Sequence, residues 1–269
     1  GMGVRSAGTL AAAGAVVGPL FRFDVGDRVR VVTHPAQPWA TVTARWAGDA
    51  GADTYGEHIY AVSGFVTRQR ESSLAGEGFV PLSLDALHEW RMAGRGHFRR
   101  AGPSMVESDG GPGILWHPRA DLADFLLLVD WRLSSPTDDS GVYVRMPPLG
   151  DRDPETDLRP AIEEGREVQV DDRGVDPERG VTGSARHVTG AIYGRAPATA
   201  RASRPVGEWN TFAIEARGAV IRVRLNGVEV CVFEGAGGRR HGHVGLQAHH
   251  PGSRVGFRNL QVRRGPVLL

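Results

Sequence analysis

The stretch DFLLLVDWRL, residues 124–133, carries the clearest structural signal in the chain. Its odd-numbered positions from Phe125 to Trp131 are all apolar. Its even-numbered positions are first leucine, at 126 and 128, and then polar, at Asp130 and Arg132. Successive side chains of a β-strand point to opposite faces, so this strand has one apolar face and one partly polar face. The stretch therefore predicts a strand of an antiparallel sheet that covers a core on one side.

The same alternation recurs on both sides of this stretch. It is found in SGVYVRM at 140–146, REVQVDD at 166–172, NTFAIEA at 210–216, VIRVRLNGVEVCVF at 220–233, VGLQAHH at 244–250 and VGFRNLQV at 255–262. Asn226–Gly227 is a typical two-residue hairpin turn, and no helix longer than about two turns is predicted here. Many short, half-buried strands of this kind indicate an all-β sandwich of two antiparallel sheets, which we expect to span residues 83–269.

Residues 21–82 predict a separate small β structure. The segments FDVGDRVRVV, ATVTARWAG, EHIYAVSGF and FVPL read as short strands cut by turns, and their order resembles that of a small SH3-like barrel. The barrel is either a spacer that packs on the larger domain, which we favour, or a binding module for a partner. An adaptor of the second kind would need an exposed apolar or basic groove between Arg28 and Phe65.

The composition excludes several kinds of function. The chain of 269 residues has a formal net charge of +1, so it has no global field to attract nucleic acid or an anionic membrane surface. All of its basic residues are arginine, so neither Schiff-base chemistry nor a lysine-bearing phosphate loop is available. Cys231 is the only cysteine, which excludes a disulfide framework and a thiolate metal cluster.

The first 20 residues form an Ala/Gly-rich segment that bears on localisation. They faintly resemble a secretory signal but lack its leucine-rich centre, and no window reaches the roughly 18 to 20 apolar residues of a membrane helix. Gly1 before Met2 is typical of a residue left by tag cleavage, and hence of a native start. We therefore expect a cytoplasmic protein without a membrane partner, with secretion as the alternative.

Long polar side chains recur on strands that otherwise bury valine, leucine and phenylalanine. This candidate set comprises Arg132, Arg145, Glu167, Gln169, Asp172, Tyr193, Gln247, His249 and Arg258. Tyr143 and Arg145 are expected on one strand face, because they are two positions apart. The loops 147–165 and 171–190 flank strand 167–170, and long loops of this kind are often functional. The alternative is that each charge simply lies on a solvated sheet face.

A series of short motifs resembles the 3-keto-disaccharide hydrolase family. In chain order these are EWRMAG, ESDGGPGILWHPR, DFLLLVDWRL, DDSGVYVR, EGREVQVDD, TGAIYG, GEWNT, RLNG, GHVGLQAHH and VGFRNLQV, within residues 84–264. The resemblance implies a concanavalin-like jelly roll with a sugar on the concave face of one sheet. It also implies hydrolysis of disaccharides and glycosides that carry a ketone at C3. Arg166 and Ala248 depart from the family pattern, which usually has an aromatic and an acidic residue there.

The chemistry of such a substrate suggests roles for the candidates. A C3 ketone acidifies the proton on C2, so a base can remove it, the C1 substituent then leaves, and water adds to the enone. His249 is the first candidate base, because its ordinary pKa of about 6.5 lies near working pH, and Glu167 is the second. His250 should point to the opposite side of a regular strand.

The remaining candidates are expected to bind the sugar or a metal. Arg145 could hold the enolate as a third catalytic residue. The expected substrate-binding residues are Arg132, Gln169, Tyr193, Gln247, Trp116 and Arg258, of which Trp116 or Tyr193 could stack on the sugar ring. The sequence identifies no cofactor with certainty, and it leaves open whether a metal is required: Glu167, Asp172 and His249 could together bind a divalent cation such as calcium or manganese. The alternative to an enzyme is a lectin-like carbohydrate-binding module on the same fold.

Overall fold

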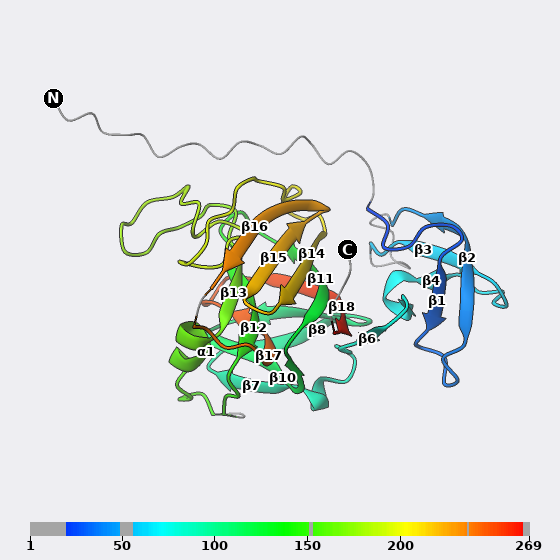
Figure 1. The fold of residues 1–269 in the computed structure, drawn as a ribbon, viewed down its shortest axis with the longest axis horizontal. Helices are drawn as coiled ribbons and strands as arrows, with labels where there is room; N and C mark the ends of the chain where they lie inside the picture. Colours follow the sequence, from blue (N-terminus) through cyan, green and yellow to red (C-terminus); the bar gives the residue numbers. More distant parts are fainter. Residues whose placement is uncertain (1–19, 49–55, 151–152, 236, 266–269) are drawn as a thin grey trace.

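The computed structural model describes residues 20–48, 56–150, 153–235 and 237–265, which form a large β-sandwich and a smaller β-sheet beside it (Figure 1). All strand pairs described are antiparallel. The sandwich confirms the all-β prediction. Within the described residues, no helix is long and apolar enough to cross a membrane.

One layer of the sandwich is a five-stranded sheet in the order β13-β12-β17-β10-β7. Its strands are β7 (Arg91–Gly94), β10 (Gly113–Leu122), β12 (Ser140–Met146), β13 (Arg166–Val170) and β17 (Gly242–Ala248). The single α-helix among the described residues, α1 (Arg159–Glu164), contacts β12 and β13.

The second layer is an eight-stranded sheet in the order β16-β15-β14-β11-β18-β9-β8, with β6 also paired to β18. Its strands are β6 (Phe79–Pro81), β8 (His97–Gly102), β9 (Met105–Asp109), β11 (Phe125–Leu133), β14 (Asn210–Arg217), β15 (Val220–Leu225), β16 (Val228–Glu234) and β18 (Val255–Arg264). The apolar side chains 125, 127, 129 and 131 of β11 are fully buried in the core between the layers. The alternation in the opening stretch therefore correctly identified the core face.

The smaller sheet has its own apolar core. It has the order β4-β3-β2-β1-β5, formed by β1 (Arg28–Val31), β2 (Trp39–Trp46), β3 (Ile59–Val62), β4 (Gln69–Arg70) and β5 (Leu74–Ala75). Strand β6, at the end of the range expected for the barrel, pairs instead with β18 of the sandwich. The likeness to an SH3-like barrel stays a prediction.

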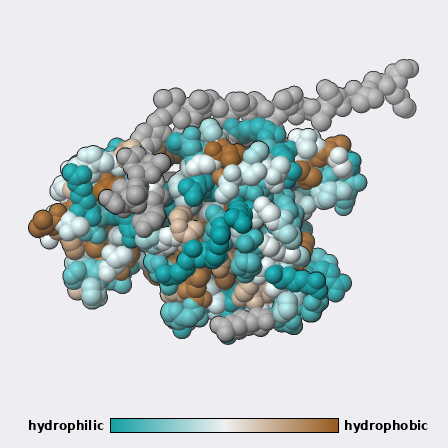
Figure 2. All heavy atoms as spheres, turned by 180° about the vertical axis from the view of Figure 1, so that it is seen from behind, coloured by the Kyte–Doolittle hydropathy of each residue, from teal (hydrophilic) through white to brown (hydrophobic). Residues whose placement is uncertain are grey.

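The hydrophobic residues on the surface do not gather into one groove on the face seen in Figure 2. There they form separate patches among polar residues on both parts of the molecule. On the smaller sheet, the exposed Trp39 lies under the guanidinium of Arg28 at 4.9 Å, and the exposed Trp46 under that of Arg68 at 3.9 Å. An arginine guanidinium thus lies over each tryptophan ring, and both tryptophans remain partly exposed.

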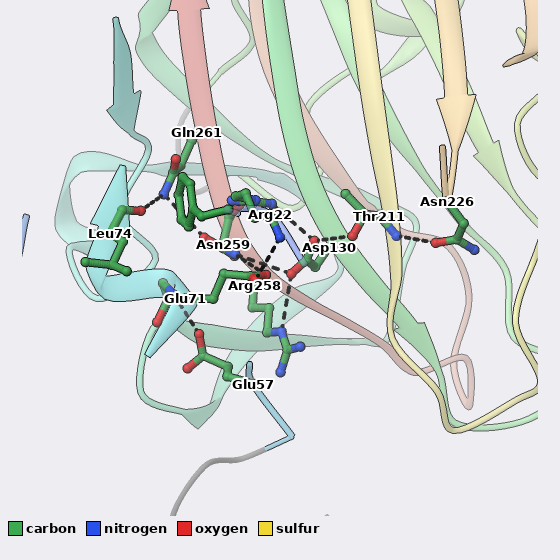
Figure 3. A network of polar contacts seen from close by, with 12 residues as sticks. Arg22, Glu57, Glu71, Leu74, Asp130, Thr211, Asn226, Arg258, Asn259 and Gln261 are labelled. Atoms are coloured by element: carbon green, nitrogen blue, oxygen red, sulfur yellow. Dashed lines mark hydrogen bonds and ion pairs between the residues drawn. The ribbon is translucent and has the colours of Figure 1, made fainter. Parts of the chain in front are cut away.

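A buried polar network joins the smaller sheet to the sandwich (Figure 3). Arg22 forms an ion pair with Asp130 of β11 at 3.2 Å and donates to the carbonyl of Asn259 at 3.0 Å. Gln261 of β18 donates to the carbonyl of Leu74 at 2.6 Å. These contacts support the packing role for the smaller sheet.

Glu71 makes this junction sensitive to pH. Burial raises its pKa to about 7, although Arg22 opposes the shift, and the hydroxyl of Tyr60 donates to its carboxyl. An unfolded glutamate ionises near pH 4.3, so between that pH and 7 the folded protein binds the extra proton and loses stability as the pH rises. Glu71→Gln cannot ionise, and we expect its melting temperature to fall less between pH 5 and pH 8 than that of the wild type.

Thermal unfolding followed by circular dichroism at several pH values tests this expectation. The matched control is Glu77→Gln, because Glu77 is exposed on the same part of the chain. A decline in Glu71→Gln as steep as in the wild type would show that another group titrates at the junction.

Candidate functional site

Rows of side chains cross the outer face of the five-stranded sheet, away from the core. The strand register aligns two full rows, Glu167, Tyr143, Gly245, Trp116 and Arg91 in the first and Gln169, Gly141, Gln247, Ile114 and Ala93 in the second. Just past the strand ends a third row continues with Asp171, Asp139, His249, Pro112 and Arg95. Antiparallel pairing thus brings residues that lie far apart in the chain onto one surface.

Glu167 lies at the β13 end of the first row in a chain of hydrogen bonds. The hydroxyl of Tyr143 donates to Glu167 Oε2 at 2.9 Å, and Gln247 Nε2 donates to the Tyr143 oxygen at 3.3 Å. Burial raises the pKa of Glu167 to about 8, with a smaller contribution from the nearby Asp139. At neutral pH Glu167 is therefore largely protonated and can donate a proton.

Gly141 provides the space for this carboxyl. A Cβ at position 141 would lie 2.2 Å from Glu167 Oε1, which is far inside van der Waals contact. Glu167 thus lies across β12 only because position 141 has no side chain.

Besides Glu167, this face carries two further titratable side chains, Asp139 and His249. Gln169 Nε2 donates to Asp139 Oδ1 at 3.1 Å, and His249 Nε2 lies 3.7 Å from Asp139 Oδ2. Burial, followed by the charge of Asp171, raises the pKa of Asp139 to about 7. Burial and the neighbouring His250 lower the pKa of His249. At neutral pH His249 is therefore uncharged and can accept a proton.

Two amide oxygens on this face have no partner. The buried Oε1 atoms of Gln169 and Gln247 accept no hydrogen bond from the residues that the structure describes. A buried acceptor without a donor costs free energy, so each favours a ligand that supplies hydroxyl or water protons.

Tyr193 borders the site from the loop that follows β13. Ile192 forms a bridge with Val168, and the Tyr193 amide donates to the Glu167 carbonyl at 2.9 Å. The Tyr193 ring lies edge-on to His187, with ring centres 4.9 Å apart. Burial and the nearby Glu167 raise the pKa of Tyr193 to about 12, so its hydroxyl keeps its proton.

Of the residues proposed from sequence, the structure therefore brings together Glu167, Gln169, Tyr193, Gln247 and His249. The sequence reasoning missed Asp139 and gave no role to Tyr143. Asp139 lies four positions before Tyr143, and strand residues an even number of positions apart share a face, so the alternation could have identified Asp139. Its proximity to Gln169 and His249 depends on the register with β13 and β17.

Arg145 does not share a face with Tyr143, so that expectation is wrong. Arg145 has a positive φ of 52°, and the register between β12 and β17 shifts after Tyr143. Its buried guanidinium donates to the carbonyls of Ala123 and Gly218 and lies 3.6 Å from Asp124. A β-bulge redirects a side chain in this way, and here it turns Arg145 toward the eight-stranded sheet.

Arg132 and Arg258 lie on the other sheet. The expectation that they share one sheet face with the other candidate residues is therefore wrong. Both guanidinium groups lie over the ring of Trp209, at 4.8 Å for Arg132 and 3.9 Å for Arg258. Arg258 also lies 3.5 Å from Asp130 and donates to the carbonyl of Gly56 across the junction. Alternation shows which residues share a strand face but not which sheet a strand joins.

Trp116 is on the correct face but is not available as a stacking surface. Its side chain is only 1% exposed and packs with Met146, Leu149 and Ala161. The segment after β12 covers this half of the sheet, so the Trp116 ring belongs to a small second core.

Asp172 points away from Glu167 and does not complete a metal site. Its carboxyl accepts hydrogen bonds from Thr189 at 2.6 Å and Ser203 at 2.7 Å. Within the described part of the chain, no group of three histidine, cysteine or acidic side chains could hold a metal ion. The proposed ligand set Glu167, Asp172 and His249 therefore does not fit a cation in this arrangement.

His250 also departs from its expected position. Strand β17 ends at Ala248, so the alternation does not extend to the two histidines, and their Nδ1 atoms lie 2.8 Å apart. The two imidazoles therefore form one contacting pair.

Comparison with known proteins agrees with this architecture. Residues 82–263 match the profile of the 3-keto-alpha-glucoside-1,2-lyase-like domain family. A candidate glycosyl hydrolase from Parabacteroides distasonis superposes with a TM-score of 0.56 at 19% identity, covering 71% of this chain and 95% of that one. A second from the same organism has a TM-score of 0.53 at 22% identity, covering 70% and 99%. No curated protein matches. At these identities the solved structures support the fold.

Proposed function

Because this chain belongs to the 3-keto-alpha-glucoside-1,2-lyase-like domain family, a family that points to hydrolases or lyases, we propose that it cleaves 3-keto-glycosides on the outer face of its five-stranded sheet. Two titratable side chains on this face support the proposal: Glu167, which lies over Gly141 and accepts a hydrogen bond from Tyr143, and His249, which lies 3.7 Å from Asp139. His249 is neutral and can accept a proton, whereas Glu167 is protonated and can donate one. Pairs of groups whose environments separate their pKa values in this way are typical of acid and base catalysts.

The first step uses His249. The C3 ketone acidifies the C2 proton, and the His249 imidazole takes that proton while the C–H electron pair becomes the enolate. Asp139, which lies 3.7 Å from His249 Nε2, stabilises the imidazolium that forms. The Tyr193 hydroxyl at the edge of the site is a donor for the enolate oxygen.

The second step uses Glu167. The enolate electrons form the C1–C2 double bond as the C1–O bond breaks, and the Glu167 carboxyl protonates the departing oxygen. Water then adds to C1 of the enone, and C2 regains a proton to form the free 3-keto sugar. The unpaired amide oxygens of Gln169 and Gln247 accept hydrogen bonds from the hydroxyls of the sugar.

A substrate labelled with deuterium at C2 tests this sequence. Elimination breaks the C2–H bond, so the purified protein should release the aglycone of a 3-keto-glucoside with a primary isotope effect. Direct hydrolysis at C1 predicts release without that effect. A parallel reaction with a chelator measures any contribution of a divalent cation.

The two amide acceptors also fit a second function, that of a carbohydrate-binding module. Such a module needs hydrogen-bond partners for a sugar but no acid and base. Binding of a 3-keto-glucoside without release of its aglycone would favour the module over the enzyme.

Gly141→Ala tests whether the position of Glu167 matters. The added Cβ displaces the Glu167 carboxyl, and a misplacement of about 1 Å can reduce catalysis by about 10²-fold. The carboxyl is the end of a flexible side chain, so we expect the melting temperature to change little while kcat falls about 10²-fold. Gly76→Ala is the control, because a Cβ there meets only ordinary contacts at 3.6 Å. Full activity of Gly141→Ala would argue against a role for Glu167.

A further inference from the structure

A hollow of about 450 Å³ lies at the β7 side of the five-stranded sheet. Its floor is formed by Gly94 and Pro112, and its walls include Pro154, Leu158 and Ile162. None of these residues was part of the site proposed from sequence.

The hollow opens on the same sheet face as the proposed site. Pro112 lies in the third row beside His249, and a Cβ on the adjacent Gly111 would touch the carbonyl oxygens of Ala248 and His249 at 2.5 and 2.6 Å. Gly113 pairs with Ala248 on one side and with Gly94 on the other. Because neighbouring strands are about 4.8 Å apart, the hollow begins about 5 to 10 Å from the His249 backbone.

The segment 153–164 forms the wall of the hollow. Its Asp153 carbonyl accepts a hydrogen bond from the Gly94 amide at 3.1 Å on β7, whereas α1 at its other end contacts β12 and β13. Leu158 packs against the apolar cluster that covers Trp116. The segment therefore crosses the sheet from β7 toward β12 and β13 and covers the part that holds Trp116.

The lining of the hollow is mostly apolar, and its charged side chains are paired. Arg95 forms an ion pair with Glu155, and Arg159 forms one with Asp157 at 2.7 Å. Ile162 is 51% exposed, although large apolar side chains are usually buried. Such a surface favours a flat apolar group over a charged or heavily hydroxylated one.

We propose that this hollow is the subsite for the group attached to C1 of the substrate, and that it selects apolar, aryl-type aglycones. The assignment rests on the proposed function for the placing of the sugar ring over Gln169 and Gln247. The C1–O bond then lies within reach of Glu167 over β12, and the group attached to that oxygen extends from there across β17 toward β10 and β7.

The test compares phenyl and methyl 3-keto-glucosides as substrates of Ile162→Gln and wild type. Removing an apolar wall from a pocket is expected to lower kcat/KM for the phenyl compound about tenfold, while the methyl compound, which does not reach the hollow, should change less than about twofold. Ile162→Leu should keep most of the phenyl preference. The control is Val232→Gln, which replaces an exposed residue on β16 of the opposite sheet.

Binding of the unoxidised phenyl and methyl glucosides, measured by calorimetry, separates this proposal from the proposed chemistry. If no 3-keto-glucoside is cleaved but the phenyl glucoside binds better and Ile162→Gln removes the difference, the subsite stands and the chemistry fails. If cleavage occurs and Ile162→Gln affects both substrates equally or neither, the subsite is overturned. The absence of both cleavage and preferential phenyl binding overturns both proposals.

Discussion

Replacing His249 with alanine is expected to lower kcat on a 3-keto-glucoside by about 10² to 10⁴-fold, which is the usual contribution of a general base. The reason is that His249 is the neutral imidazole on the same face as Glu167, with Asp139 positioned to stabilise its charged form. Steady-state release of the aglycone by purified protein is the measurement. Loss of kcat with little change in sugar binding would separate a catalytic role from a binding role.

Two further histidine variants test whether the loss of activity is specific to His249. His241→Ala changes a surface histidine that pairs with Asp121, so its activity should equal that of the wild type. His250→Ala removes a neighbour that lowers the pKa of His249. In that variant the acid limb of kcat/KM should move to higher pH, because His249 must lose its proton before it can act as a base. Wild-type activity in His249→Ala would show that His249 is not the base.

Replacing Glu167 with glutamine is expected to have the second largest effect, and its size should depend on the leaving group. A methoxide leaving group needs a proton, so kcat for methyl 3-keto-glucoside should fall by about 10²-fold or more. A nitrophenolate leaves readily without a proton, so the loss on the nitrophenyl compound should be much smaller. Equal losses on the two substrates would mean that Glu167 does not protonate the leaving oxygen.

The pH profile gives a second readout of Glu167. Its pKa is raised to about 8, so the wild type should lose activity as the pH rises through 8 and the carboxyl ionises. Glutamine has no ionisable proton, so this alkaline limb should disappear in Glu167→Gln. The acid limb, which reports His249, should remain. Persistence of the alkaline limb in the variant would assign it to another group that must stay protonated.

These expectations depend on how the sheet holds the two groups. Glu167 lies over Gly141 and receives the Tyr143 hydrogen bond, so its carboxyl has a defined position. His249 lies beyond the end of β17 and is 42% exposed at its side chain, so it can move toward a bound ligand. A rigid acid beside a more mobile base is compatible with a site that adjusts when the sugar binds.

The amino-acid sequence alone was enough to predict the class of fold and several residues of the candidate site. Alternating apolar residues identified the core faces of β11, β12 and β13, because a strand buries every second side chain whatever its neighbours are. The same alternation placed Glu167 and Gln169 on one face of β13, whereas His249 lies beyond the end of β17. The series of short motifs, from EWRMAG at 89–94 to the last strand, correctly indicated the family.

Which of these faces meet depends on the pairing of the strands in the folded protein. Strand pairing placed Arg132 on the sheet opposite Glu167, and a single positive φ at Arg145 turned its side chain away from Tyr143. Alternation within a strand carries no information about its partner strands, their register or a bulge, since these depend on contacts between distant segments. For the same reason Asp139 became a functional candidate only when the fold brought it between Gln169 and His249.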